Sequence, residues 1–402
     1  MRYIRFLKTP RIVTEKGSNK SHVYCLITIT SDLGDSFFPH NVELAAELLS
    51  LKENPDVGSK DLLDDEVLVW STIRWTAGMR TLAVKLPLKK SYASKPFLVR
   101  VGLEPQSSFD TFEALSDPDA HGIVSAWSAP FNTSDRKEAE KLVQRRFEIG
   151  EKVLKIWEET GESIDRHLWD AGITLSHHLS SLLSNSSKDP LYSALDALHQ
   201  NLKQATVPNL KALVEEEDYD ADLEELRIFE LGAGCGIVGL TLASLVPGCK
   251  VHMTDLPSAQ EIVEKNEVAT GSTRAFNSQT NFLELDWEEK LPDHAVAPEL
   301  PVALVVASDC TYNADSSPAL VKTLERLARI SGSHMIVAIA MKMRHDSEKV
   351  FFDLMAEAGF NETALLEWPL PGDIEAGEEI VYMHVYRHDG EENLGRYESD
   401  SE

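Results

Sequence analysis

A glycine-rich turn between an apolar strand and an apolar helix constrains the fold of this chain more than any other stretch. It extends over Phe229–Leu240 and reads FELGAGCGIVGL. Glycine adopts φ > 0 easily and lets a ligand come close to the backbone. The helix that follows offers N–H groups and a partial positive charge to an anionic group. The stretch therefore predicts a loop that binds a nucleotide-type cofactor.

The loop matches two different cofactor patterns. Gly234–Gly239 satisfies the dinucleotide pattern G-x-G-x-x-G, and Asp255 supplies an acid about 20 residues further on, as that pattern requires. Glu230–Gly236 equally satisfies the S-adenosylmethionine (SAM) pattern, which is an acid followed by three alternating glycines. The loop alone leaves both cofactors open, so the rest of the chain has to decide between them.

The composition limits the partners of the protein. The chain has 402 residues, enough for two domains, and a net charge of −27. Phosphate groups repel such a surface, so we expect neither a nucleic-acid nor a membrane partner. No stretch has the length of a membrane helix, and the basic start lacks the apolar run of a signal peptide. We expect a monomer in the cytoplasm, with the nucleus as a second location.

The four cysteines indicate a reducing compartment. Their positions show neither a disulfide framework nor the spacing of metal ligands, so no metal site is expected at Cys25, Cys235, Cys249 or Cys310.

Residues 1–135 are predicted to form a mainly-β domain, either a sandwich or a barrel. Short apolar, β-branched runs alternate with turn-rich pieces, as at Val23–Ile29 and Val67–Ile73. We expect one short helix in this region, at Val42–Leu51. The domain shows no catalytic constellation, so we assign it a structural or substrate-docking role.

Residues 136–225 are predicted to connect two domains. A charged helix is expected near Arg136–Gln144, and Arg146–Trp157 fits a hairpin better than a continuation of that helix. Leu168–Gly172 carries a Trp-Asp pair just before an apolar-faced helix, and we expect Asp170 to cap that helix. Ser184–Glu225 is interpreted as an insertion that contains a solvated acidic run.

Residues 226–388 alternate between strands and helices, the pattern of a doubly wound α/β sheet. The last two expected strands, Thr363–Trp368 and Ile380–Tyr386, have no helix between them. They predict a terminal antiparallel hairpin, which is typical of SAM-dependent methyltransferases and unusual in dinucleotide domains. The acidic residues 389–402 are expected to form a disordered tail.

Three blocks of residues resemble the seven-β-strand protein-lysine methyltransferases, also called methyltransferase family sixteen. They are Leu168–Gly172, Glu230–Gly236 and Ser308–Tyr312, and the resemblance covers roughly residues 145–388. The family implies a Rossmann-like SAM domain that transfers a methyl group to a lysine of a protein. Relatives act on translation factors, ribosomal proteins and chaperones, and nothing in this sequence selects among them.

The residues themselves and the resemblance to the family both place the expected cofactor-binding and catalytic residues at the carboxyl ends of the strands. The backbone of the glycine loop can approach the methionyl and ribose parts of SAM, Asp255 suits the ribose hydroxyls, and Trp287 can stack on adenine. The resemblance implies that Trp169 closes the pocket and that Ser308 contributes to it. The full cofactor set is Trp169, Glu230, Gly232, Ala233, Gly234, Gly236, Asp255, Trp287 and Ser308.

Asp309 and Tyr312 are the expected catalytic residues. A methyl acceptor must be a neutral amine, and a carboxylate favours the charged form, so we assign Asp309 to aligning the lysine nitrogen rather than to strong base catalysis. Tyr312 is expected to wall the lysine channel. The alternatives are methyl transfer to a small molecule or another nucleophile, a non-catalytic protein that retains the fold, and an NAD enzyme.

Overall fold

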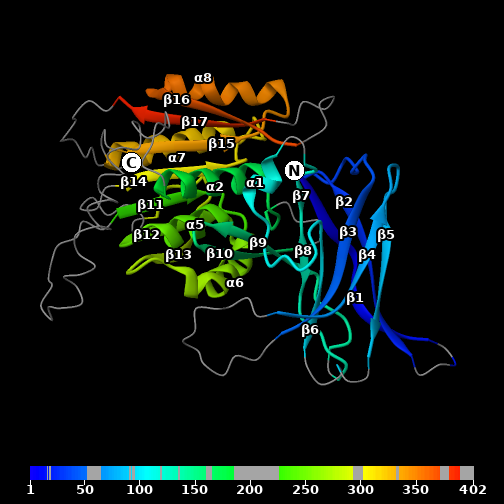
Figure 1. Ribbon diagram of the computed structural model, residues 1–402. Helices are drawn as coiled ribbons and strands as arrows, with labels where there is room; N and C mark the ends of the chain where they lie inside the picture. The colour runs from blue at the N-terminus through cyan, green and yellow to red at the C-terminus, as the bar shows by residue number, and fades with distance from the viewer. Residues whose placement is uncertain are drawn as a thin grey trace, which may run out of the picture. The chain divides into compact units, whose positions relative to one another are not determined.

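The computed structural model describes residues 1–15, 17, 20–51, 65–89, 92, 96–117, 120–134, 136–159, 165–184, 226–292, 302–331, 335–371 and 380–389. The chain divides into two compact units (Figure 1). The N-terminal unit consists of Met1–Asp170 with the segments Lys265–Thr273 and Pro369–Glu379. The second unit comprises Ala171–Glu264, Arg274–Trp368 and Ile380–Glu402. Each unit has its own core and is described by itself.

The described part of the N-terminal unit forms two β-sheets and a short helix, α1 (Phe112–Ser116). The first sheet has the order β5 (Leu82–Leu88), β2 (Ser21–Thr30), β1 (Arg2–Thr14), β7 (Ile123–Val124). The second has the order β10 (Lys152–Glu159), β9 (Leu142–Ile149), β8 (Ala126–Ser128), β6 (Phe97–Gly102), β3 (Val42–Ser50), β4 (Glu66–Trp75). Ile4 and Ile27 of one sheet share a hydrophobic core with Leu48 and Val99 of the other. The two sheets therefore form a β-sandwich.

Two local predictions for this unit differ from the structure. Val42–Leu51 is not a helix, because Val42–Ser50 forms β3 between β4 and β6, where it is buried on both faces and shows no alternating pattern. The helix near Arg136–Gln144 is also wrong. The side chain of Asn132 accepts the backbone N–H groups of Ser134 and Arg136 in a turn, and β9 begins at Leu142.

The predicted hairpin over Arg146–Trp157 is present, as strands β9 and β10. Both strands belong to the six-stranded sheet, so the N-terminal unit extends to Asp170, beyond the boundary at residue 135 expected from the sequence. A buried ion pair holds the two strands together, with Arg145 Nε 2.7 Å from Glu158 Oε1. The insertion Ser184–Glu225, apart from Ser184, and the tail 389–402, apart from Asp389, lie outside the described residues.

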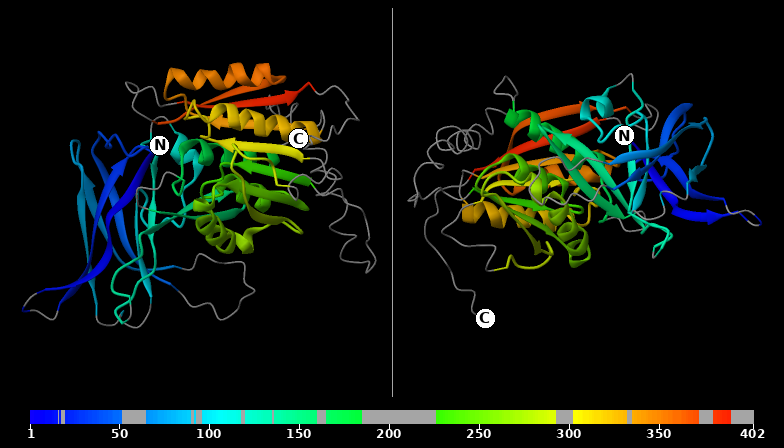
Figure 2. Two further views of the ribbon diagram at one scale, coloured as in Figure 1. Left: turned by 180° about the vertical axis from the view of Figure 1, so that it is seen from behind. Right: turned by 60° about the horizontal axis from the view of Figure 1, so that its bottom comes forward.

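The second unit is built on a sheet that has seven strands in its described part. Their order is β13 (Gln279–Glu284), β12 (Cys249–Asp255), β11 (Leu226–Leu231), β14 (Val302–Ser308), β15 (Ile336–Met341), β17 (Ile380–His388), β16 (Phe360–Pro369). Strands β11 to β15 run parallel, and β17 is antiparallel to β15. Figure 2 shows β17 and β16 in red and orange at one edge of this sheet. The structure thus confirms the predicted fold class, which is a Rossmann-like α/β sheet preceded by a mainly-β region.

Helices cover both faces of this sheet. Its helices are α2 (Asp170–Ser184), α5 (Ile237–Leu245), α6 (Gln260–Thr270), α7 (Ser317–Ser331) and α8 (Val350–Glu357). Phe229 and Leu231 of β11 point to the core shared with α7 and α8. Glu230 lies between them and faces Gly239 of α5, since successive side chains of a strand point to opposite faces. No helix among the described residues is long and apolar enough to cross a bilayer.

A buried ion pair in the sandwich provides a test of its energetics. Glu47 accepts Arg100 Nη1 at 3.0 Å and the backbone N–H of Gln106 at 2.6 Å, and both charged side chains are about fully buried. We expect Glu47→Ala to lower the free energy of unfolding by about 3–5 kcal/mol, because it leaves the Arg100 charge buried without its partner. Urea unfolding followed by tryptophan fluorescence measures this difference.

The exposed pair of Arg136 and Glu140 is the matched control, because these side chains are 55% and 45% exposed. Glu140→Ala should change the free energy of unfolding by less than about 0.5 kcal/mol. Equal effects of the two substitutions would contradict the role given to burial.

Candidate active site

The candidate site lies where the strand order of the second sheet reverses. From β11 the chain continues to β12 and β13 on one side, and it returns to β14 on the other side of β11. β11 and β14 are parallel neighbours, so their carboxyl ends meet at the same edge of the sheet. The loops that follow these ends diverge, which is the position where open α/β sheets bind their ligands. The glycine-rich loop follows β11, and Asp309 follows β14.

All three alternating glycines of the loop have left-handed backbone. The φ values of Gly232, Gly234 and Gly236 are +64°, +55° and +75°. The N–H of Ala233 donates to the carbonyl of Thr254 at 3.0 Å, so the loop is fixed to the end of β12. Any other residue at the three glycines would be strained, which explains the spacing in the sequence.

Gly232 is also the place where the loop meets the end of β14. A Cβ atom at Gly232 would lie 2.6 Å from Cys310 Sγ and 3.4 Å from an indole carbon of Trp287. The Cys310 thiol donates to the carbonyl of Leu231 at 3.2 Å, and burial raises its pKa well above the usual range. The thiol is therefore a packing group and a weak donor, not a nucleophile.

Asp255 and Trp287 lie beside the loop, and their contacts with a cofactor stay a prediction. Asp255 Oδ2 accepts the N–H of Gly234 at 2.8 Å, and Oδ1 accepts the N–H of Leu256 at 2.7 Å. The carboxylate is thus fixed at the tip of β12. Trp287 is half-buried after β13, next to Gly232, and packs against the core of the sheet.

Glu230 supports the loop from below. Its side chain is buried, and Oε2 accepts the N–H of Gly239 in the first turn of α5 at 2.9 Å. Oε1 has no hydrogen-bond partner among the described residues. Burial raises the pKa of Glu230 to about 8, although the backbone N–H groups of Gly239 and Val238 oppose this shift. The carboxyl group therefore holds a proton more readily than an ordinary glutamate.

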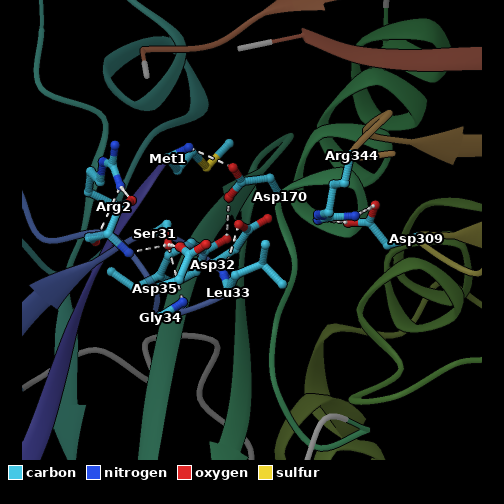
Figure 3. A network of polar contacts seen from close by, with 12 residues as sticks. Met1, Arg2, Ser31, Asp32, Leu33, Gly34, Asp35, Asp170, Asp309 and Arg344 are labelled. Carbon is cyan, nitrogen blue, oxygen red and sulfur yellow. Dashed lines mark hydrogen bonds and ion pairs between the residues drawn. The ribbon is translucent and has the colours of Figure 1, made fainter. Parts of the chain in front are cut away.

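Asp309 is held by an arginine that the sequence analysis did not identify. Arg344, in the loop after β15, places Nη1 2.9 Å from Asp309 Oδ1 and Nη2 3.3 Å from Oδ2 (Figure 3). Asp309 has a left-handed backbone, with φ of +52°, and its N–H donates to the carbonyl of Ala340 at 2.8 Å. The parallel pairing of β14 with β15 brings the two loops together. A cation shortly after the neighbouring strand is the signal that could have revealed it.

The remaining predicted residues occupy different environments. Ser308 is half-buried at the end of β14, and its Oγ lies 3.4 Å from the position of a Cβ at Gly172, so the first turn of α2 contacts this strand closely. Tyr312 is 57% exposed, so any role at the site is at its entrance. Trp169 is half-buried and belongs to the N-terminal unit, and its place at a cofactor stays a prediction.

Asp170 contacts residues at the start of the chain, while the helix cap expected from the sequence stays a prediction. It is the first residue of α2, and its Oδ1 accepts the hydroxyl of Tyr3 at 2.7 Å, while Oδ2 lies 2.6 Å from the nitrogen of Met1 (Figure 3). Its burial against Tyr3 ties the start of the helix to β1 within the N-terminal unit.

The residues around the loop fit SAM chemically. Three left-handed glycines carry no Cβ, so a ligand can approach the backbone of the loop closely, and the anchored Asp255 carboxylate lies beside it. A half-buried indole, Trp287, completes the group. The set contains a backbone that a ligand can approach closely, a carboxylate for a diol and an aromatic ring for adenine.

Comparison with known proteins identifies the same part of the chain. A family model described as lysine methyltransferase matches residues 148–358, which is more than half of the 402 residues.

Three individual relatives are similar to the chain, and two of them are named lysine methyltransferases. The chain is 26% identical to a Schizosaccharomyces pombe protein of the UPF0665 family, over 87% of this chain and 91% of that protein. It is 32% identical to protein N-lysine methyltransferase METTL21A of Danio rerio, over 32% of this chain and 56% of the relative. It is also 32% identical to EEF1A lysine methyltransferase 3 of Xenopus tropicalis, over 35% of this chain and 58% of the relative. The matches to the two named methyltransferases thus span little more than half of those proteins.

The close approach at Gly232 predicts a specific defect. Gly232→Ala should bring a methyl group within 2.6 Å of Cys310 Sγ, in addition to straining a backbone with φ of +64°. We expect it to lower the melting temperature and to weaken SAM binding at least about tenfold, because the loop must shift away from β14. Thermal unfolding and titration calorimetry measure the two effects.

Gly248→Ala is the control variant, because it introduces backbone strain without a steric clash. Gly248 has φ of +67°, and nothing lies within 4 Å of its Cβ position. This variant should lose about 1 kcal/mol of stability and keep its affinity for SAM. If Gly232→Ala bound SAM as well as Gly248→Ala does, the contact with β14 would not shape the site.

The raised pKa of Glu230 predicts how stability depends on pH. Its pKa rises from 4.5 to about 8 on folding, so between these values the folded chain holds a proton that the unfolded chain has lost. Stability therefore falls as pH rises through this window, by at most about 1.4 kcal/mol per pH unit. Glu230→Gln should remove this component, so its stability relative to the unmodified protein should rise with pH. Urea unfolding at several pH values measures the difference, and parallel pH profiles would contradict the assignment.

Proposed function

Because this chain belongs to the lysine methyltransferase family, we propose that it uses SAM to methylate a lysine side chain of a protein. The observation that carries the proposal is the contact of the glycine loop with the end of β14, where Gly232 and Cys310 leave no room for a side chain. This contact supports a site shared by the loop and Asp309, because Asp309 directly precedes Cys310 in the chain. Membership of this family also favours SAM over a dinucleotide as the cofactor. The loop pattern alone was compatible with both.

Each part of the cofactor has a proposed partner in the chain. The backbone of Gly232–Gly234 binds the methionyl and ribose portions, and Asp255 binds the ribose hydroxyls. An ionised carboxylate has about four acceptor sites, so Asp255 can serve the ribose while its oxygens also accept the N–H groups of Gly234 and Leu256. Trp287 stacks on adenine, supported by its position beside Gly232. Glu230 and Gly236 hold the loop on α5.

Two further residues complete the proposed pocket, on the resemblance to the family. Ser308 contributes at the end of β14, where it already lies against the start of α2. Trp169 closes the pocket from the residues that precede this helix.

The reaction requires a neutral amine. When bound, SAM supplies a methyl group on a positively charged sulfur. Deprotonating a lysine near neutral pH costs roughly 4–5 kcal/mol from its ordinary pKa, and a site near a sulfonium lowers that cost by repulsion between like charges. Asp309 aligns the nitrogen and Tyr312 walls the entrance, so that most of the rate arises from proximity and orientation.

The protein substrate belongs to a class suggested by relatives. One relative is named an EEF1A lysine methyltransferase, and another is named a protein N-lysine methyltransferase without a stated substrate. We therefore expect a protein acceptor, and translation factors are the first candidates. The alternatives are a small-molecule acceptor and a SAM-binding protein without activity.

Incubation with labelled SAM and a dialysed cell extract tests the function. We expect label on a lysine of one or a few proteins, identified by mass spectrometry. Asp309→Asn should reduce the initial rate at least about a hundredfold and leave SAM affinity within about twofold, because alignment of the amine is lost and the cofactor loop is untouched.

Asp315→Asn is the matched control, because Asp315 is exposed a few residues further along the same loop. It should label the extract at the unmodified rate. Label only in the non-protein fraction would indicate a small-molecule acceptor, and SAM binding without any label would indicate a binding protein.

A further inference from the structure

Arg344 and Asp309 form a buried ion pair at the carboxyl ends of β14 and β15. The two guanidinium nitrogens engage the two carboxylate oxygens at 2.9 and 3.3 Å (Figure 3). The Asp309 side chain is 4% exposed and that of Arg344 is 14% exposed, so the ion pair is largely shielded from water. This paired arrangement has a fixed geometry, since guanidinium and carboxylate match as planar groups.

The pair leaves little acceptor capacity on Asp309. Oδ1 accepts Arg344 Nη1 and also the backbone N–H of Lys342 at 3.2 Å, and Oδ2 accepts Arg344 Nη2. A carboxylate has about four acceptor sites, so within the described residues three are used and one remains, on Oδ2. Asp309 can therefore accept one further N–H group, such as that of a substrate amine, without losing the arginine.

Other charged groups near the pair do not replace Arg344. Glu348 is buried, and its Oε1 accepts the backbone N–H of Arg344 at 3.0 Å, so it adds negative charge. Cys310 is a neutral thiol, and Lys342 contributes its backbone N–H to Asp309. Asp255, Asp309 and Glu230 also help burial to raise the pKa of Cys310, so these neighbours add no positive charge. In the described structure, Arg344 is the side chain whose positive charge bonds directly to the Asp309 carboxylate.

We propose that Arg344 is a positioning residue, which neutralises Asp309 so that the carboxylate aligns the lysine amine without keeping it protonated. This inference rests on the proposed function. An isolated carboxylate beside the amine would stabilise the ammonium form, which cannot react. Paired with a guanidinium, it has almost no net charge but still accepts a hydrogen bond. The amine then loses its proton to solvent, and its lone pair forms the N–C bond while the C–S electrons remain on sulfur.

Arg344→Met removes the charge and keeps much of the apolar stem. We expect the acceptor amine to bind more tightly but in its protonated form. The pH profile of kcat for label transfer from SAM to the extract protein should shift to higher pH by about one unit, with a rate about tenfold lower near neutral pH. The KM for the acceptor should fall over the same range. A purely structural role would lower the rate at all pH values without moving the profile.

Two further variants separate charge from fold. Arg344→Lys keeps the charge and should retain a profile close to that of the unmodified protein. The double variant Asp309→Asn with Arg344→Met has neither charge, so it folds without a buried isolated carboxylate. The pH profile of its residual label transfer should match that of the unmodified protein. A profile that does not move in Arg344→Met, or that moves equally in Arg344→Lys, would overturn the proposal.

A small cation tests the same claim without the unknown substrate. n-Butylammonium carries the head of a lysine side chain and can be titrated against the protein saturated with demethylated SAM, with aspartate carbon signals observed by NMR. Arg344→Met should bind it about tenfold more tightly than the unmodified protein, since Asp309 gains net charge. Equal affinities would overturn the role of Arg344. An extract that takes up no label would instead reject the proposed function, and this titration would still decide on Arg344.

Discussion

The close approach of Gly232 to Cys310 is the constraint on which the rest of the site depends. Here the loop after β11 meets the segment after β14. Cys310 Sγ lies 2.6 Å from the position that a Cβ atom would occupy at Gly232, so only glycine fits. The left-handed backbone of Gly232 and Gly234, on either side of Ala233, is a second and separate reason for glycine in this loop. The proposed cofactor loop and Asp309, proposed to align the amine, thus follow two neighbouring strands whose pairing fixes their separation.

Charge around the site is arranged by burial as much as by residue type. Glu230 is buried against α5 and retains its proton to about pH 8, so it supports the loop with little negative charge. Asp309 is ionic but is matched by Arg344. Two of the acidic side chains at this edge of the sheet therefore add little net negative charge to the proposed site. The net charge of −27 belongs to the whole chain and does not describe this edge.

Periodic and motif-like features could be predicted from the sequence, and contacts between distant residues could not. The glycine spacing located the loop, and alternation located the hairpin of β9 and β10. Val42–Ser50 contains good helix formers, yet pairing with β4 and β6 makes it a strand, because tertiary context outweighs local preference. Arg344 lies 35 residues from Asp309, and no local pattern connects them. Buried ion pairs of this kind need the folded sheet to define them.

The burial of Cys310 gives the site a built-in reporter. Its thiol is enclosed by the loop after β11 and donates to Leu231, and its raised pKa leaves almost no thiolate. An alkylating reagent can reach the sulfur only when that loop separates from the end of β14, so the rate of modification follows the frequency of this opening rather than the intrinsic reactivity of the thiol. A ligand that clamps the two segments together makes the protein resistant to thiol reagents, without any contact between ligand and sulfur.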